Sequence, residues 1–193
     1  ADDAIDGSNT TTRDQNWFFQ AQFEDNNTIT ITRAGGTQPA SVIFQVIEFE
    51  DGVNVQRGIS SMQPTGSANL IKNITLPTTM ADKNKAVPIV QVSGLYTVSQ
   101  GTTTDQLCLL PSFPDNSTLQ LQRMNVSGTR AITLSWQVIE FLTDATVQSA
   151  QGALATPGAN STPQTVTSSL SSAVTIPIMF TYFNGSTSIG GIE

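Results

Sequence analysis

The chain contains the same pentapeptide twice, as Gln45-Val46-Ile47-Glu48-Phe49 and as Gln137-Val138-Ile139-Glu140-Phe141. The second copy follows the first by 92 residues. The similarity continues upstream, where residues 25–33 return as residues 115–123 at an offset of 90, and downstream, where Val55-Gln56 returns as Val147-Gln148. A period of about 90 residues indicates repeated units of domain size rather than the short rungs of a solenoid.

The phase of the repeat predicts how the 193 residues are divided. Residues 1–58 correspond to the back half of a unit, residues 59–152 to a complete unit, and residues 153–193 to the front half of a third. The split unit must be completed, either within one chain or with a neighbouring chain. The sequence leaves both possibilities open.

Strand patterns dominate the chain. Residues 28–32, 119–122 and 131–138 alternate polar and apolar side chains with a period of two, which is typical of half-buried strands. Residues 42–49 and 134–142 are richer in apolar and β-branched side chains and are predicted to be central strands buried on both faces. Further strands are expected at residues 70–76, 86–92, 165–170 and 173–183.

Turn signals separate these strands, and no amphipathic helix is evident. Residues 51–67 and 144–162 have the composition of loops or linkers. Short strands with turns between them are typical of antiparallel sandwiches. The sequence therefore predicts an all-β fold with two Ig-like antiparallel β-sandwich units, one complete and one split between the two ends of the chain.

The composition of the chain narrows the range of possible functions and partners. The net charge is −7 with no cluster of basic residues, which argues against nucleic acid or an anionic membrane surface as a partner. No apolar run reaches the roughly 18 residues that a membrane span needs. Ser and Thr are abundant and only 12% of the residues are charged, a composition typical of exported β proteins. We expect an extracellular or cell-surface location, with a virion surface also open.

The residue inventory argues against an enzyme. The chain has no histidine, so Ser-His-Asp and Cys-His triads are excluded. It also has no glycine-rich phosphate-binding loop. Glu48 and Glu140 occupy equivalent places in different units, so they are not expected to face one cleft as a glycosidase pair would. Cys108 is the only cysteine and lies in an apolar run. No catalytic residue, cofactor or metal site is predicted.

The repeated charges suggest a structural role. Strand alternation places Glu48 on a face with Phe44 and Val46, and it places Arg33 at the end of another apolar face. The same holds for Glu140 and Arg123 in the complete unit. We therefore expect two structural ion pairs, Arg33–Glu48 and Arg123–Glu140. The alternative is that all four are solvated charges at strand ends.

Aromatic and apolar residues near the two ends are the candidates for a subunit junction. The cluster at residues 17–23 aligns with residues 107–113 of the complete unit, so core packing is the default reading and a sugar-binding platform is the alternative. The predicted junction comprises Trp17, Phe18, Phe19, Phe23, Ile176, Ile178, Phe180 and Tyr182.

Seven positions satisfy Asn-x-Ser/Thr, and most lie in predicted turns. Glycosylation is an expectation only where the source has the machinery, and turn composition alone also explains the motifs. The possible sites are Asn9, Asn26, Asn73, Asn116, Asn125, Asn160 and Asn184.

The motif at residues 136–141, and residues 45–49 followed by Val55-Gln56-Arg57-Gly58, resemble a repeat of large tandem-repeat surface and fibre proteins of bacteria and environmental sequence sets. In that repeat, a strand of the type Trp-x-Val-Val-Glu-Phe closes a β unit and a Val-Gln-Arg-Gly turn leads to the next. The second copy departs from it, because Ser149-Ala150 stands where Arg57-Gly58 stood. The resemblance implies an extracellular structural repeat and no catalytic residue.

These observations favour a structural subunit of an extracellular filament or fibre. Copies would polymerise head to tail by sharing or completing β-sandwiches, since an incomplete sandwich exposes sheet edges that a neighbour's strand can satisfy. The alternative is a carbohydrate- or receptor-binding β-sandwich module of a cell-surface or virion fibre protein, with the split unit closed inside one chain. The expected partners are copies of the chain itself and, in the alternative, surface glycans.

Overall fold

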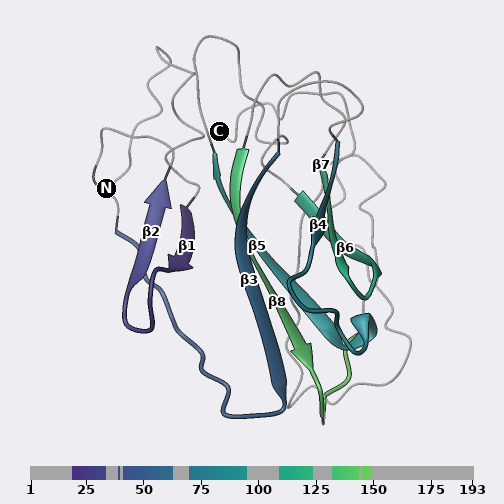
Figure 1. The fold of residues 1–193 in the computed structure, drawn as a ribbon. Helices are drawn as coiled ribbons and strands as arrows, with labels where there is room; N and C mark the ends of the chain where they lie inside the picture. The colour runs from purple at the N-terminus through teal and green to yellow at the C-terminus, as the bar shows by residue number, and fades with distance from the viewer. Residues whose placement is uncertain are drawn as a thin grey trace, which may run out of the picture.

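The computed structural model describes residues 19–33, 39, 41–62, 70–94, 109–123, 132–143 and 145–148 (Figure 1). Within these ranges the only regular element that is not a strand is a short 3-10 turn, η3 (Lys83–Lys85). The prediction of an all-β fold is confirmed for this part of the chain. The strands are β1 (Phe19–Phe23), β2 (Ile29–Arg33), β3 (Val53–Met62), β4 (Ile71–Thr75), β5 (Ala86–Gly94), β6 (Leu109–Asp115), β7 (Thr118–Arg123) and β8 (Ile132–Phe141).

Six strands form two antiparallel sheets of three. β8 lies between β3 and β5 in the first sheet, and β7 lies between β4 and β6 in the second. β3 pairs with β8 over its whole length, from Val53 opposite Phe141 to Met62 opposite Ile132. β5 pairs with the other edge of β8, starting with Ala86 opposite Glu140. Residues far apart in the sequence therefore meet on the two sides of one central strand.

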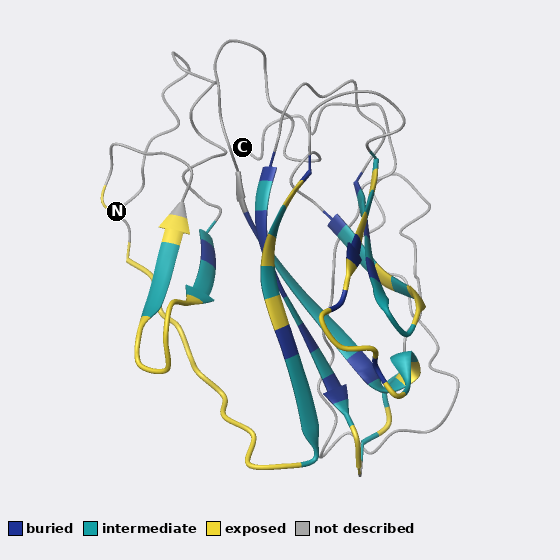
Figure 2. Cartoon of the chain, in the orientation of Figure 1, coloured by how far each residue is buried: buried dark blue, intermediate teal, exposed yellow. Residues whose placement is uncertain are grey.

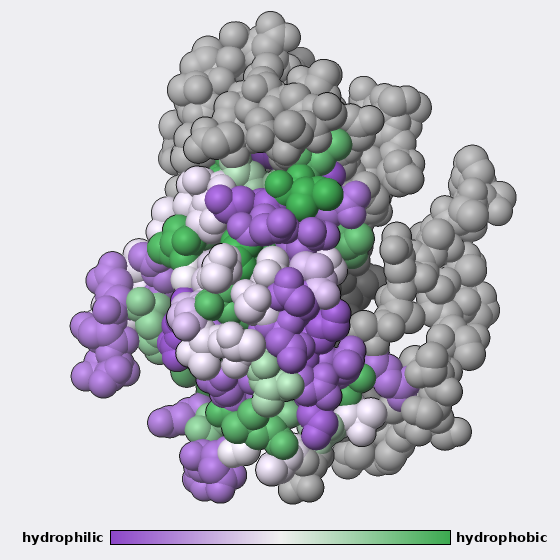
Figure 3. All heavy atoms as spheres, turned by 45° about the vertical axis from the view of Figure 1, so that its right-hand side comes forward, coloured by the Kyte–Doolittle hydropathy of each residue, from purple (hydrophilic) through white to green (hydrophobic). Residues whose placement is uncertain are grey.

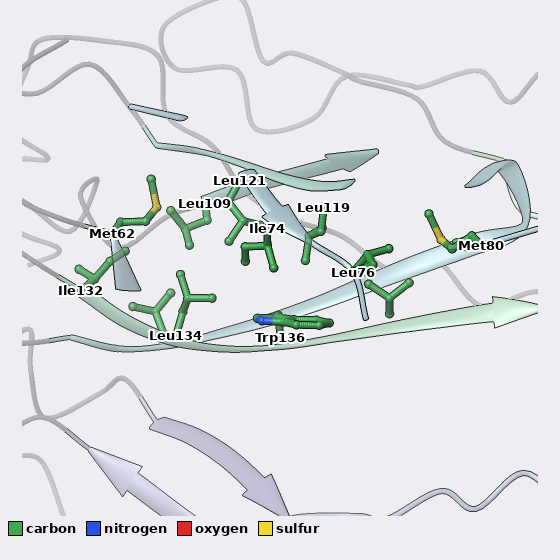
Figure 4. Packing of buried hydrophobic residues seen from close by; sticks show 13 residues of the cluster. Met62, Ile74, Leu76, Met80, Leu109, Leu119, Leu121, Ile132, Leu134 and Trp136 are labelled. Carbon is green, nitrogen blue, oxygen red and sulfur yellow. The ribbon is translucent and has the colours of Figure 1, made fainter. Parts of the chain in front are cut away.

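The two sheets face each other and enclose the hydrophobic core (Figures 2 and 4). Side chains alternate across a strand, so every second residue of β8 points into this core. Trp136 lies in the middle of the layer, and Leu119 and Leu121 of β7 are fully buried in the same cluster. Two packed antiparallel sheets with a shared core are compatible with a β-sandwich.

The β1–β2 hairpin covers the other face of the first sheet, away from the second sheet (Figures 1 and 4). Its backbone is tied to β5 because the amide of Ala21 donates to Oε1 of Gln91 at 2.9 Å. The hydroxyl of Ser135 on β8 donates to the same oxygen at 3.3 Å. The guanidinium of Arg57 on β3 stacks 4.8 Å from the centre of the Phe23 ring. Three layers result: the hairpin, the β3–β8–β5 sheet and the β4–β7–β6 sheet.

The first four residue pairs of the hairpins β1–β2 and β6–β7 have the same register at an offset of 90 residues, and β6–β7 then has an irregularity between Ser112 and Asp115. Phe19 lies opposite Arg33 in the first, and Leu109 lies opposite Arg123 in the second. The registers of these two hairpins therefore begin at corresponding residues of the repeated sequence.

The turns of these hairpins are also alike. A carboxylate oxygen of Asp25 accepts from the amide of Asn27 at 2.7 Å, and one of Asp115 accepts from the amide of Ser117 at 2.7 Å. Hydrogen bonds to the ionised carboxylate favour the charged form. The amide of Asn27 is the main reason that the pKa of Asp25 lies below its ordinary value. At Asp115 the Ser117 hydroxyl is the main cause of the lowered pKa, followed by the Ser117 amide.

Several predicted strands are confirmed. Residues 70–76 contain β4, residues 86–92 lie within β5, and residues 134–142 coincide with most of β8. The predictions for residues 165–170 and 173–183 lie outside the described residues.

Two predictions about residues 41–67 are wrong. The stretch 51–67, predicted as a loop or linker, contains the ten-residue strand β3. Residues 42–49, predicted as a buried central strand, are exposed and lie in no strand. A strand needs a hydrogen-bonding partner as well as a suitable pattern. Among the described residues β3 finds that partner in β8, whereas residues 42–49 have none.

Candidate strand-pairing interface

Segment 42–49 carries the sequence of a central strand but lies outside any sheet. At an offset of 92 residues it corresponds to residues 134–141 of β8, and the last five residues are identical. The inward-facing residues of β8 are almost fully buried, whereas their counterparts in the segment are exposed to solvent. Leu134, Trp136 and Val138 have exposures of 0%, 4% and 0%, and Val42, Phe44 and Val46 have exposures of 40%, 57% and 55%.

The other face of the segment is also apolar and exposed. Ile43 is 95% exposed and Ile47 is 75% exposed. Soluble proteins rarely leave a contiguous run of large apolar side chains in water unless the run binds something. On the face that Figure 3 brings forward, hydrophobic residues are scattered among hydrophilic ones instead. The segment is therefore a candidate binding element.

The surroundings of Glu140 in β8 show which hydrogen-bond donors this glutamate position of the repeated strand sequence needs when it is buried in a sheet. Glu140 is 2% exposed, and one of its carboxylate oxygens accepts from the amide of Asp82 at 2.9 Å. The other is 3.4 Å from Nδ2 of Asn54, on the neighbouring strand β3. A buried carboxylate is tolerated only with such donors. Glu48 is the counterpart in the segment and is exposed.

The largest inward side chain of β8 requires a glycine opposite. Gly58 of β3 lies opposite Trp136, and a β-carbon added to Gly58 would lie 2.7 Å from Cζ2 and 2.9 Å from Cε2 of the indole. Such distances are too short for carbon atoms, so a larger residue would displace the ring. The glycine at this position is explained by the close approach of the indole. The sequence analysis did not identify it, although a glycine within a run that returns as Ser149-Ala150 was the available signal.

A tight turn joins the segment to β3. Gly52 has a φ of +67°, a conformation that glycine adopts readily. The amide of Leu142 donates to the carbonyl of Gly52 at 2.8 Å, which ties the turn to the end of β8. The rings of Phe49 and Phe141 meet edge to face with centroids 6.4 Å apart. The C-terminal end of the segment therefore lies at the end of the sheet where β8 also ends.

The predicted pair Arg123–Glu140 is not formed. Glu140 lies beside Asp82, and the amide of the next residue, Lys83, donates to Asn116 in the β6–β7 turn at 3.2 Å. Arg123 ends β7, five residues beyond Thr118, or roughly 17 Å along the strand. Both charges were correctly placed at the margins of apolar faces, but the strand directions put them at opposite ends of the core.

Arg123 is 4% exposed, and this burial lowers the pKa of its guanidinium below the ordinary value. The other predicted pair, Arg33–Glu48, involves an arginine whose side chain lies outside the described part of the structure. Its partner Glu48 is exposed to solvent.

The predicted junction residues are described only in part. Phe19 is half-buried in β1, and Phe23 is 38% exposed beneath Arg57. The other members, Trp17, Phe18, Ile176, Ile178, Phe180 and Tyr182, lie outside the described residues.

Three of the possible glycosylation sites are described. Asn26 and Asn73 are exposed, as a glycan requires. Asn116 is half-buried, and its Nδ2 donates to the carbonyl of Ala81 at 3.3 Å, so its amide is already engaged. Asn9, Asn125, Asn160 and Asn184 lie outside the described residues.

Comparison with protein families, with curated proteins and with solved structures finds no match. The described part of the chain contains no group of three or more acidic, histidine or cysteine side chains arranged to hold a metal ion. None of the helical structure described is long and apolar enough to cross a membrane.

Proposed function

We propose that this chain is a non-enzymatic structural subunit of an extracellular filament or fibre, whose copies polymerise head to tail by completing each other's β-sandwiches. The observation that supports this proposal is that the same pentapeptide lies in two different environments. The pentapeptide that forms the centre of a sheet at residues 137–141 is solvent-exposed at residues 45–49. Adding a strand to an open sheet satisfies its backbone groups and buries its side chains together.

The apolar content of the segment indicates how strongly it favours a sheet. Burying a large apolar side chain contributes about 1.5–3 kcal/mol. Segment 42–49 exposes six such side chains: Val42, Ile43, Phe44, Val46, Ile47 and Phe49. Insertion between two strands would bury most of both faces. A contact of this kind is heterologous, so it propagates from copy to copy unless it closes into a ring.

We further propose that each unit is Ig-like. If β3 to β8 are taken as strands A to F, the pairings B–E–D and C–F are those of the Ig sandwich. β3 then takes the place that strand G would have beside F. The matching registers and turns of the β1–β2 and β6–β7 hairpins support a second unit of the same design. Its central strand would be segment 42–49.

The test is the assembled state of the purified chain, measured by light scattering and electron microscopy. We expect regular filaments whose axial repeat is one or two sandwich lengths. The variant Phe44→Ser should raise the concentration needed for assembly by about tenfold or more, because a buried phenyl ring is lost. It should leave the melting of the dilute protein unchanged, because Phe44 lies outside the described core.

The matched control is Ile71→Ser on β4, where the side chain is 50% exposed but lies outside the segment. It should assemble as the unmodified chain does. A protein that stays monomeric at high concentration would contradict the proposal and favour a unit closed within one chain. Equal loss of assembly in both variants would show that general surface hydrophobicity, and not the segment, drives association.

A further inference from the structure

We infer that segment 42–49 closes onto the free edge of β3 in its own chain, as the first strand of a hairpin, and that this closed form competes with assembly. The competing role rests on the proposed function, whereas the closed contact does not. Among the described residues, β3 pairs with β8 on one edge and with no strand on the other. β3 is ten residues long and contains no proline, so its second edge is open to strand addition.

The backbone of β3 presents its unpaired groups at alternate residues. The amide of Leu142 donates to the carbonyl of Gly52 at 2.8 Å, one position before the pair Val53–Phe141 of the same register. Hydrogen-bonded and non-hydrogen-bonded pairs alternate between antiparallel strands, so Val53 and Phe141 are not hydrogen-bonded to each other. The amide and carbonyl groups of Val53, and of every second residue after it, therefore point to the free edge.

The turn between the segment and β3 has the length and shape of a hairpin loop. Three residues, Glu50, Asp51 and Gly52, separate Phe49 from Val53. Three-residue hairpin loops commonly combine a type I turn with a third residue in the left-handed conformation. Gly52 is that third residue, and its φ is +67°. In such a loop the flanking residues, Phe49 and Val53, lie opposite each other.

This loop gives the segment the same register on β3 that β8 has on the other edge. Val53 lies opposite Phe141, and Phe141 follows Phe49 by 92 residues, the offset of the repeat. A hairpin that closes at Phe49 and Val53 therefore places the same repeated sequence on both edges of β3. The rings of Phe49 and Phe141 meet edge to face with centroids 6.4 Å apart, so the two residues that would flank Val53 are already close together.

On the outer face of the sheet, the closed form brings exposed apolar side chains together. Ile43, which is 95% exposed, would lie opposite Ile59, which is 51% exposed. Ile47, which is 75% exposed, would lie opposite Val55, whose neighbour on the other side is Ile139. Cross-strand pairs of apolar side chains stabilise a sheet. Closure therefore removes apolar surface from water at both isoleucines of the segment.

On the inner face, the carboxylate of Glu48 meets a hydrogen-bond donor. In this register Glu48 lies opposite Asn54, whose Nδ2 is 3.4 Å from a carboxylate oxygen of Glu140. A side-chain amide has two N–H donors, so the second is available to Glu48. Phe44 would lie opposite Gly58, which has no side chain to oppose the phenyl ring. The closed register therefore leaves neither the charge nor the largest ring of the segment in conflict with β3.

The closed and the assembled forms exclude each other. In the assembled form proposed above, the segment is inserted between two strands and both of its edges are used, so β3 cannot hold it. The structure has the segment open, bending away from the end of β3 (Figure 1), so the closed form is the less populated state of the isolated chain. The two forms compete for one segment, and a change that favours closure raises the concentration needed for assembly.

The first test traps the closed form with a disulfide. The variant Ile43→Cys with Ile59→Cys, in a Cys108→Ser background, is mildly oxidised in dilute solution. We expect a cross-linked monomer, because opposite residues of paired strands lie within the reach of a disulfide. The matched control, Val42→Cys with Ile59→Cys, should cross-link about tenfold more slowly or less, because adjacent residues of a strand point to opposite faces. Equal cross-linking of the two variants, or none in either, would overturn the closed form.

The second test measures the competition in the same variant, Ile43→Cys with Ile59→Cys. Its oxidised form should need a concentration about tenfold higher or more for assembly than its reduced form, because the closed chain withholds the segment. Reduction with dithiothreitol should restore assembly, and the reduced sample is the control because its sequence is the same. Oxidised chains that assemble as readily as reduced chains would overturn the competing role.

The behaviour of the unmodified chain separates this inference from the proposed function. Filaments of the unmodified chain, without the expected cross-link in the variant, would overturn the closed form and leave the proposed function standing. Cross-linked monomers of the variant, from a chain that never forms filaments, would support the closed contact and remove the proposed function together with the competing role.

Discussion

At the centre of the core, Gly58 of β3 lies against the indole of Trp136 on β8. We expect Gly58→Ala to destabilise the complete unit by about 1–3 kcal/mol, because the added carbon would lie 2.7 Å from the indole. Chemical denaturation followed by tryptophan fluorescence would measure this. Ser61→Ala, at an exposed position of the same strand, should change stability by less than about 0.5 kcal/mol.

Combining Gly58→Ala with Trp136→Phe should recover part of that loss, because the smaller ring removes the clash. The substitution also removes Nε1 of Trp136, which is buried without a hydrogen-bond partner in the described structure. Circular dichroism replaces fluorescence for this variant. Losses that simply add would contradict direct contact between the two residues.

Glu140 provides the second prediction at the scale of single residues. Glu140→Ala should cost about 1–3 kcal/mol, because the amide of Asp82 and Nδ2 of Asn54 lose their acceptor. Glu140→Gln keeps one carbonyl oxygen and should cost less. Thermal unfolding of dilute protein measures both effects.

The repeated sequence supplies the matched control, Glu48→Ala. Glu48 is exposed, so this substitution should change stability by less than about 0.5 kcal/mol in dilute solution. Equal losses at both glutamates would contradict the different environments of the two copies.

At the scale of elements, the β6–β7 hairpin depends on the ionised carboxylate of Asp115. Its pKa is lowered in the folded state, chiefly by the hydroxyl of Ser117. The stabilisation is therefore present above the ordinary pKa of 3.8 and is lost as the pH falls through the lower folded value. Asp115→Asn keeps a carbonyl acceptor but removes the charge.

We expect the unmodified chain to melt at a higher temperature than Asp115→Asn near neutral pH. The difference in melting temperature should shrink as the pH falls below the ordinary pKa of 3.8, because the carboxylate of Asp115 becomes protonated and loses its charge. Thermal unfolding of both proteins across this range provides the measurement. A difference that stays constant with pH would mean that the charge of Asp115 contributes nothing.

Sequence patterns predicted those strands whose apolar residues recur with a regular period. β5, β7 and β8 follow such patterns, and the core residues Leu119, Leu121 and Val138 could be assigned from alternation alone. β3 could not, because its sequence contains Gly58 and several polar residues and reads as a loop. It is a strand because β8 offers it a hydrogen-bonding edge over its whole length. Gly58 is explained by the nearby indole of Trp136.

The candidate interface was predictable to a similar degree. The repeat identified residues 42–49 as strand-like, but a pattern specifies compatibility with a sheet and not the identity of the partner. The prediction of an Arg123–Glu140 pair failed for a related reason. Alternation gives the face on which Arg123 and Glu140 lie, whereas their separation depends on strand direction and on the order of strands in the two sheets.

At the scale of the whole molecule, the proposed assembly can be tested by comparing the two copies of the pentapeptide, which lie in different environments. The pentapeptides at residues 45–49 and 137–141 are identical, so their amides have nearly the same intrinsic rates of hydrogen exchange. The preceding residues, Phe44 and Trp136, allow the two peptides to be distinguished by mass. Any difference in exchange between them reflects structure.

In dilute protein, the amides of residues 137–141 should exchange slowly, because β8 is hydrogen-bonded to β3 on one side and to β5 on the other. Those of residues 45–49 should exchange at close to the intrinsic rate, because they lie in no strand. In filaments both pentapeptides should be protected to a similar degree, since each would then be the central strand of a sheet. Hydrogen exchange measured by mass spectrometry across a concentration series makes the comparison. If residues 45–49 are already fully protected in the monomer, the chain closes on itself. If their protection instead rises with the assembled fraction, segment 42–49 is the element that joins one copy to the next.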